Sequence, residues 1–145
     1  QLYVNIENIR FCNEIQYAVH IDERVDLKAI KIPSLILQPF IENALWHGLQ
    51  PKEGEKLLTL DVALKNDEFV TITITDNGIG RKKTMEVASE KVNTQKKSIG
   101  INLTLRRLQN FSKNLRNTYA LRFIDLYDEQ EYPAGTQVLI DLPIK

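Results

Sequence analysis

Two neighbouring segments of this chain, 56–64 and 69–75, carry apolar side chains at every second position. The alternating residues are Leu58, Leu60, Val62 and Leu64 in the first segment, and Val70, Ile72 and Ile74 in the second. A two-residue period is typical of a β-strand that buries one face. Because Asn66 and Asp67 can form a turn between them, the two segments predict an antiparallel hairpin.

Further strand and helix patterns flank this hairpin. Segments 14–22, 118–127 and 136–142 also alternate, and residues 133–135 are expected to belong to the connection before the last strand. Segments 2–11 and 98–111 have apolar residues at helical spacing. Helices and antiparallel strands in this mixture predict an α+β fold: a two-layer α/β sandwich, with a mixed, mostly antiparallel sheet covered on one face by helices.

The segment 37–49 is apolar at helical spacing, yet it carries Glu42, Asn43 and His47 on or beside its apolar stripe. Asparagine is a poor helix former because its amide competes for backbone hydrogen bonds. The presence of Asn43 in this helix therefore indicates that its side chain binds a ligand. The alternative is an amphipathic helix whose polar residues mark its solvent edge.

Prolines and a glycine set the expected limits of this helix. Pro33 favours a first-turn position, and Gly48 is expected to end the helix after about His47. Pro39 lies inside the pattern and removes a backbone hydrogen bond. The helix is therefore expected to kink at Pro39 or to consist of two short segments, of which the second carries Asn43.

Composition limits the class of protein. A chain of 145 residues with 43% hydrophobic and 26% charged residues fits one globular domain. The 19 basic and 19 acidic side chains balance, which argues against general binding of nucleic acid or of a membrane surface. Cys12 is the single cysteine, so an internal disulfide is excluded. The chain begins at Gln1 within a helical pattern, and we expect it to be a piece of a longer protein.

Three polar groups of residues lie at the ends of expected elements: Asn43 with its neighbour Glu42, the run 76–80, and the run 98–100. Asn43 offers an uncharged oxygen of the kind that Mg²⁺ accepts beside phosphate oxygens. Asp76 could accept a hydrogen bond from an exocyclic amine, and the glycines of its run allow close approach to a flat ring. Amides at the start of the helix near Gly100 could face phosphates.

In this order the motifs resemble those of the Bergerat-fold (GHKL) ATPases, and in particular the catalytic HATPase domain of LytS-type sensor histidine kinases. Segment 37–48 resembles the N box, Asp76-Asn77-Gly78-Ile79-Gly80 the G1 box, and segment 98–108 the G2 region. Gly135-Thr136 resembles the signature of the last strand. The resemblance implies that residues 1–12 end a preceding dimerisation and phosphoacceptor segment and that residues 13–145 form the ATP-binding domain, with an ATP lid at about 81–98.

The resemblance implies a site for ATP and Mg²⁺. Asn43 would be catalytic together with Glu42 and would hold the Mg²⁺, Asp76 would bind the adenine amino group, and Thr136 would support Asp76. The residues expected to contact ATP are Asn43, His47, Asp76, Gly78, Gly80, Lys96, Lys97, Ser98, Gly100, Ile101 and Thr136.

Several positions depart from the family pattern. Trp46 stands where a basic residue is common, so Lys96 or Lys97 would have to substitute for it, and Ser98 and Leu103 replace a usual glycine and asparagine. Pro39 occupies the place of the glutamate that activates water in hydrolytic relatives, which favours phosphoryl transfer over hydrolysis.

The function implied is therefore that of a protein-histidine kinase. Its catalytic domain would transfer the γ-phosphoryl group of MgATP to a histidine on an upstream domain, so the fragment alone would not autophosphorylate. The resemblance also implies a homodimeric parent anchored in the bacterial inner membrane, a cytoplasmic location for this domain, and a response regulator as partner. The alternative is a degenerate nucleotide-binding regulatory module without phosphotransfer.

Overall fold

The computed structural model describes residues 14–26, 28, 30, 36–81, 103–110, 112, 113, 115 and 118–144. Five strands form one sheet in the order β1-β2-β3-β5-β4. The strands are β1 (Ile15–Ile21), β2 (Lys56–Leu64), β3 (Phe69–Asp76), β4 (Ala120–Tyr127) and β5 (Pro133–Pro143). β1 pairs with β2 in parallel and the other pairs are antiparallel, so the mixed, mostly antiparallel sheet is confirmed.

The central hairpin of β2 and β3 follows the predicted alternation. Leu60 pairs with Ile74 and Val62 with Ile72, which puts the apolar residues of both strands on one face. Asn66 stabilises the turn, because its Oδ1 accepts the backbone N–H groups of Glu68 at 2.8 Å and Phe69 at 3.0 Å. The hairpin prediction is thus correct in both its strands and its turn.

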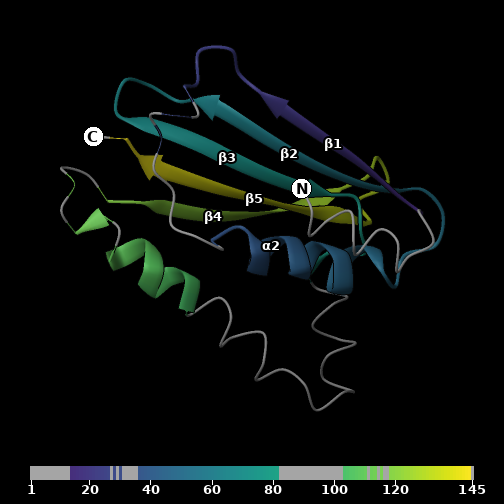
Figure 1. Ribbon diagram of the computed structural model, residues 1–145. Coiled ribbons are helices and arrows are strands. Elements are labelled where there is room, and N and C mark those ends of the chain that lie inside the picture. The colour runs from purple at the N-terminus through teal and green to yellow at the C-terminus, as the bar shows by residue number, and fades with distance from the viewer. Residues whose placement is uncertain are drawn as a thin grey trace.

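Helices cover one face of this sheet. Figure 1 shows α2 (Gln38–Glu42) and the helix that contains 103–110 on the same side of the strands. The core lies in this layer and consists of Ile15, Val25, Ile36, Phe40, Ala44, Leu45, Leu49, Leu58, Val70, Ile72, Ile74, Leu108, Val138, Ile140 and Leu142. Two layers around one core confirm the predicted α+β sandwich. None of the helices in the described part of the chain is long and apolar enough to cross a membrane.

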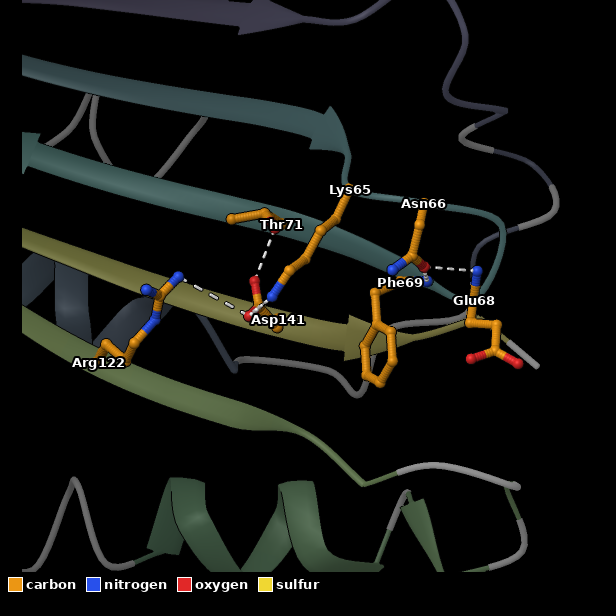
Figure 2. A network of polar contacts seen from close by, with 7 residues as sticks. All are labelled: Lys65, Asn66, Glu68, Phe69, Thr71, Arg122 and Asp141. Atoms are coloured by element: carbon orange, nitrogen blue, oxygen red, sulfur yellow. Dashed lines mark hydrogen bonds and ion pairs between the residues drawn. The ribbon is translucent and has the colours of Figure 1, made fainter.

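The opposite face of the sheet is polar, and its buried carboxylate belongs to Asp141 on β5. Lys65 donates to Asp141 Oδ2 at 2.7 Å and the Thr71 hydroxyl donates to Oδ1 at 2.6 Å, while an Arg122 nitrogen lies 3.9 Å from Oδ2 (Figure 2). A buried charge is tolerated when it is paired and hydrogen-bonded. This network ties the β2–β3 turn to β5 and β4, away from the helical layer.

The helix of segment 37–49 differs from its prediction at both ends. It does not run on from Pro33, because Ile36 and Leu37 form a bend and α2 begins at Gln38. Pro39 therefore lies in the first turn, where its missing N–H costs no helical hydrogen bond. After Glu42 the chain continues as a π-helix, η1 (Asn43–Leu49), in which the Gln50 N–H donates to the Leu45 carbonyl at 2.8 Å.

Two glycine-containing regions also depart from the prediction. Gly48 does not end the helix but lies within η1. Residues 133–135 are not a connection, since β5 already begins at Pro133 and the strand irregularity falls between Leu126 and Tyr127. Gly48 and Gly135 each lie where a backbone or side chain from a distant part of the sequence approaches closely.

Three predicted segments fall wholly or partly outside the described residues. They are the helical stripe at 2–11, the lid at about 81–98, and the first part of the helix 98–111. Of that helix, residues 103–110 are helical, with Leu108 fully buried and Leu103 50% exposed. This part of the helix prediction is confirmed.

Candidate functional site

The candidate site is centred on Asp76, the last residue of β3. The buried positions of β3 alternate along the strand, and Asp76 falls in the same register as Ile72 and Ile74, so its side chain enters the helical layer. The residue is 6% exposed. Its Oδ1 accepts the Gly78 N–H at 2.9 Å. Within the described part of the chain no basic side chain forms an ion pair with Asp76.

Burial raises the pKa of the Asp76 carboxyl from 3.8 to about 6, although backbone hydrogen bonds from Gly78 and Thr136 and the charge of Lys52 oppose the rise. A charged carboxylate in a dry site is unfavourable unless donors surround it. Because a carboxylate has about four acceptor positions, Asp76 can accept hydrogen bonds beyond those donated by the described residues. A carboxylate that only stabilised the fold would more often have a cation beside it.

Glycines bring three backbones against Asp76. A Cβ atom added to Gly48 would lie 2.8 Å from Asp76 Oδ1, and one added to Gly135 would lie 2.0 Å from the Asp76 carbonyl oxygen. A Cβ atom on Gly78 would lie 2.3 Å from both C and O of Gly48. These contacts are closer than any side chain permits, so helix η1, the turn after β3 and strand β5 can meet here only through glycine.

A backbone hydrogen bond joins helix η1 to the turn that follows Asp76. The Ile79 N–H donates to the Gly48 carbonyl at 3.0 Å. Asn43 lies at the other end of η1 and is half-buried, and its amide has no hydrogen-bond partner among the described residues. One helix thus carries both the polar Asn43 side chain and the glycine that contacts Asp76.

Asn77 holds the turn on its other side. Its Oδ1 accepts the Leu57 N–H at 2.7 Å, and its Nδ2 donates to the Glu55 carbonyl at 3.1 Å. The side chain therefore satisfies backbone groups at and just before the start of β2. Sequence reasoning assigned no role to Asn77, although an asparagine directly after a strand is a common signal for such a backbone contact.

Arg81 fixes the far end of the turn to β4. Its guanidinium donates to both carboxylate oxygens of Asp125, at 2.7 Å and 3.0 Å, and its central carbon lies 5.2 Å from the centre of the Phe123 ring. That ring contacts Phe40 of α2 at a centroid distance of 6.2 Å. The last described residue before segment 82–102 is thus held by a two-pronged ion pair and a cation–π contact.

Some of the predicted site residues lie close to Asp76, and others lie outside the described residues. Gly78 donates to it, and Thr136 pairs with it across β3 and β5. Gly80 has a left-handed φ of +83°, and a Cβ on it would lie 3.0 Å from Pro133. Lys96, Lys97, Ser98, Gly100 and Ile101 lie outside the described residues.

The remaining predicted residues lie on the helix. Glu42 accepts a hydrogen bond from Gln38 Nε2 at 3.1 Å, one helical turn away. His47 is half-buried in η1, and Trp46 packs against the core. Among the described residues no three histidine, cysteine, aspartate or glutamate side chains gather to hold a metal ion. The role of each residue toward a nucleotide stays a prediction.

Two residues at the centre of this geometry were missed by sequence reasoning as contacts of Asp76. The sequence pattern predicts a helix stop at Gly48 and a strand signature at Gly135, and it indicates no contact of either with Asp76. The signal for Gly48 was its position inside a helical pattern, where glycine is costly and needs a packing reason.

The chain is similar in sequence to known sensor proteins and sensor histidine kinases. No protein-family model matches the chain. The chain is 33% identical over 106 residues to the sensor protein LytS of Oceanobacillus iheyensis, covering 72% of this chain and 18% of that protein. It is 40% identical over 78 residues to the sensor histidine kinase YpdA of Escherichia coli, covering 54% of this chain and 13% of that protein. The chain thus spans less than a fifth of the length of these curated relatives.

Solved structures are similar in fold. The histidine kinase domain of the blue-light activated histidine kinase from Erythrobacter litoralis EL346 matches with a TM-score of 0.61 and 19% identity, covering 97% of this chain and 60% of that one. The catalytic domain of the histidine kinase ThkA, in a nucleotide-free form, matches with a TM-score of 0.60 and 12% identity, covering 97% and 86%. At these identities the likeness shows a shared fold.

Proposed function

The chain belongs to the LytS-type sensor histidine kinases, and we propose that it is the domain that binds ATP and donates the γ-phosphoryl group. The observation that carries this proposal is the buried Asp76 carboxylate at the end of β3, which accepts backbone N–H groups and has no ion-pair partner among the described residues. Such a carboxylate fits the exocyclic amine of adenine, a neutral donor that needs no compensating charge.

Adenine recognition would combine this hydrogen bond with the shape of the glycine turn. Gly78 and Gly80 let the turn after Asp76 pack against the Gly48 backbone and Pro133, and this turn would form the backbone wall against which a flat ring lies. Thr136 lies opposite Asp76 in the β3–β5 register and supports it from the neighbouring strand. A base without the amino group would leave the buried carboxylate unsatisfied, which is the usual basis of strong discrimination.

Asn43 would hold Mg²⁺ together with the phosphate oxygens. Its half-buried amide, without a hydrogen-bond partner among the described residues, fits a hard cation that takes most of its ligands from phosphate and water. When bound, Mg²⁺ neutralises phosphate charge. Asn43 would position the phosphates from η1, while Glu42 is engaged with Gln38 and would support the helix locally.

Transfer would proceed to a histidine of an upstream domain. The bond between the γ-phosphorus and its bridging oxygen breaks, a phosphorus–nitrogen bond forms, and ADP leaves. Pro39 occupies the helical position one turn before Asn43 and supplies no carboxylate to activate water, which favours transfer over hydrolysis. The upstream domain, a response regulator and a homodimeric parent anchored in the inner membrane are the partners and setting that this family membership implies.

A second candidate function is nucleotide sensing without transfer. Trp46 favours it, because this half-buried side chain packs against the core where a cation near the phosphates would be expected. A domain of this kind would bind adenine through Asp76 but would hold the triphosphate weakly. The two candidate functions therefore differ in how much more tightly the domain would bind ATP than adenosine.

Calorimetry on the isolated domain tests the proposal. We expect MgATP to bind, and to bind more tightly than either adenosine or ATP without Mg²⁺. Absence of binding at millimolar MgATP would refute the proposed function. Equal affinity for MgATP and adenosine would instead support the sensing module. Addition of the parent's phosphoacceptor segment in a second experiment should then restore phosphorylation of its histidine.

A further inference from the structure

We propose that Gly48 is a specificity-determining positioning residue, which sets the Asp76 carboxylate in the orientation that selects adenine. This inference rests on the proposed function for the ligand, but its structural part does not. Gly48 contacts the carboxylate itself rather than the strand: an added Cβ would lie 2.8 Å from Oδ1, 3.2 Å from Cγ and 3.5 Å from Oδ2.

The backbone of Gly48 cannot retreat from Asp76. Its carbonyl accepts the Ile79 N–H at 3.0 Å, and its C and O atoms lie where a Cβ of Gly78 would be. Both neighbours belong to the turn that follows Asp76. Helix and turn are therefore locked together by backbone contacts, and the distance between Gly48 and the start of the turn is fixed.

The Asp76 side chain is consequently the group that would yield to a methyl group on Gly48. It is short; the Thr136 backbone also donates to its carboxyl group, and the Gly78 N–H donates to Oδ1 at 2.9 Å. Rotation of the carboxylate away from Gly48 would break this bond and turn the oxygens from their present direction. A Gly48→Ala substitution thus acts on the orientation of Asp76 before it acts on the rest of the fold.

The π-helical winding explains how one helix can present both Asn43 and Gly48 to the site. In an α-helix residues i and i+5 point about 140° apart, because each residue turns by about 100°. In η1 the hydrogen bonds join residue i to residue i+5, so residue i+5 lies on much the same side of the helix as residue i. Asn43 and Gly48 have this spacing. The winding therefore brings the proposed Mg²⁺ ligand and the Asp76 contact onto similar faces.

Nucleotide discrimination is the first test. The wild-type domain should bind ATP at least tenfold more tightly than purine riboside triphosphate, which lacks the 6-amino group but has the same phosphates. Gly48→Ala should reduce this ratio at least several-fold while remaining folded. Gly54→Ala is the control for adding a methyl group away from Asp76, because nothing lies within 4 Å of that methyl; unlike Gly48, Gly54 has a positive φ of +89°, so this variant also carries local backbone strain. A purely structural role for Gly48 would weaken both nucleotides equally and leave the ratio unchanged.

A double-mutant cycle on stability is the second test and needs no nucleotide. Gly48→Ala should lower the urea midpoint in the wild-type background but much less in the Asp76→Ala background, where all three contacting atoms are gone. If Gly48→Ala alone does not fold, folding of the double variant supports the inference, and failure of the double variant overturns it. Equal destabilisation in both backgrounds also overturns it.

The two tests separate the inference from the proposed function. If the wild-type domain does not bind ATP, the proposed function fails and the cycle still decides whether Gly48 positions Asp76. If ATP binds and the Gly48→Ala variant keeps the full preference for ATP, the inference fails and the proposed function stands.

Discussion

Replacing Asp76 by asparagine should make the free domain more stable at alkaline pH while it weakens ATP binding. The folded protein holds the carboxyl at a pKa of about 6 against an ordinary value of 3.8, because burial disfavours the charge. The difference of about 2 is equivalent to about 3 kcal/mol, since each pKa unit is worth about 1.4 kcal/mol. Asp76→Asn removes the charge and keeps the oxygen that accepts the Gly78 N–H.

The pH dependence follows from the sign of this pKa change. The folded state binds the Asp76 proton more tightly than the unfolded state, so wild-type stability falls as pH rises from about 4 to about 6 and the full loss persists above that. Asparagine avoids this loss but presents an NH₂ group in place of one acceptor, which costs about 1 kcal/mol. The free energy of unfolding of the variant should therefore be about 2 kcal/mol higher than that of the wild type at pH 8, and about equal to it near pH 4.5.

Urea unfolding of both proteins at pH 4.5, 6 and 8 measures this difference, and titrations of all other groups cancel in the comparison. Asp67→Asn, in the exposed β2–β3 turn, is the control for replacing a carboxylate by an amide away from the site. Calorimetry at pH 8 should show at least a tenfold loss of ATP affinity for Asp76→Asn, because a hydrogen bond to a charged group is lost. A variant that is less stable than the wild type at pH 8, or a difference that does not change with pH, would refute the reasoning.

Three further predictions concern the same site. Lowering the pH from about 7.5 to about 5.5 should weaken ATP more than purine riboside triphosphate in calorimetry, because protonation of Asp76, whose pKa is about 6, removes the acceptor for the amino group; equal losses would contradict this. Asn43→Ala should lower ATP affinity chiefly when Mg²⁺ is present, and the metal role is wrong if the loss is the same in the presence of a chelator. Arg81→Gln should lower the free energy of unfolding by up to about 1 kcal/mol, since both partners of its ion pair with Asp125 are partly exposed; a urea double-mutant cycle with Asp125→Asn that shows no coupling would contradict the ion pair.

The strands were predictable because their signal is local. The alternation in 56–64 and 69–75 requires one face to be buried, and a one-residue slip in register would turn Ile72 and Ile74 to the other face. The same pattern, together with the glycines of the turn, predicted a strand end at residue 75, one residue before the observed end of β3 at Asp76. The hairpin and the position of the central carboxylate could therefore be read from neighbouring residues alone.

The helix ends and the last connection were not predictable in this way. Gly48 has the appearance of a helix stop in the sequence, and residues 133–135 that of a turn, because glycine and proline usually mark the ends of elements. Both interpretations were wrong, since each glycine is needed where another part of the chain comes within contact distance of it. The winding change at Asn43 has no local signal either, because propensities do not separate α- from π-helix.

What the sequence by itself determined is the set of elements and the identity of the polar residues at their ends: Asn43 on a helix, Asp76 after a strand, and the glycines between them. Periodicity and residue chemistry are properties of short segments, so they survive without a fold. Only the tertiary structure decided that η1 brings Gly48 against the Asp76 carboxylate and that burial raises its pKa to about 6. Both depend on segments distant in the chain packing together and excluding water, which no local pattern encodes.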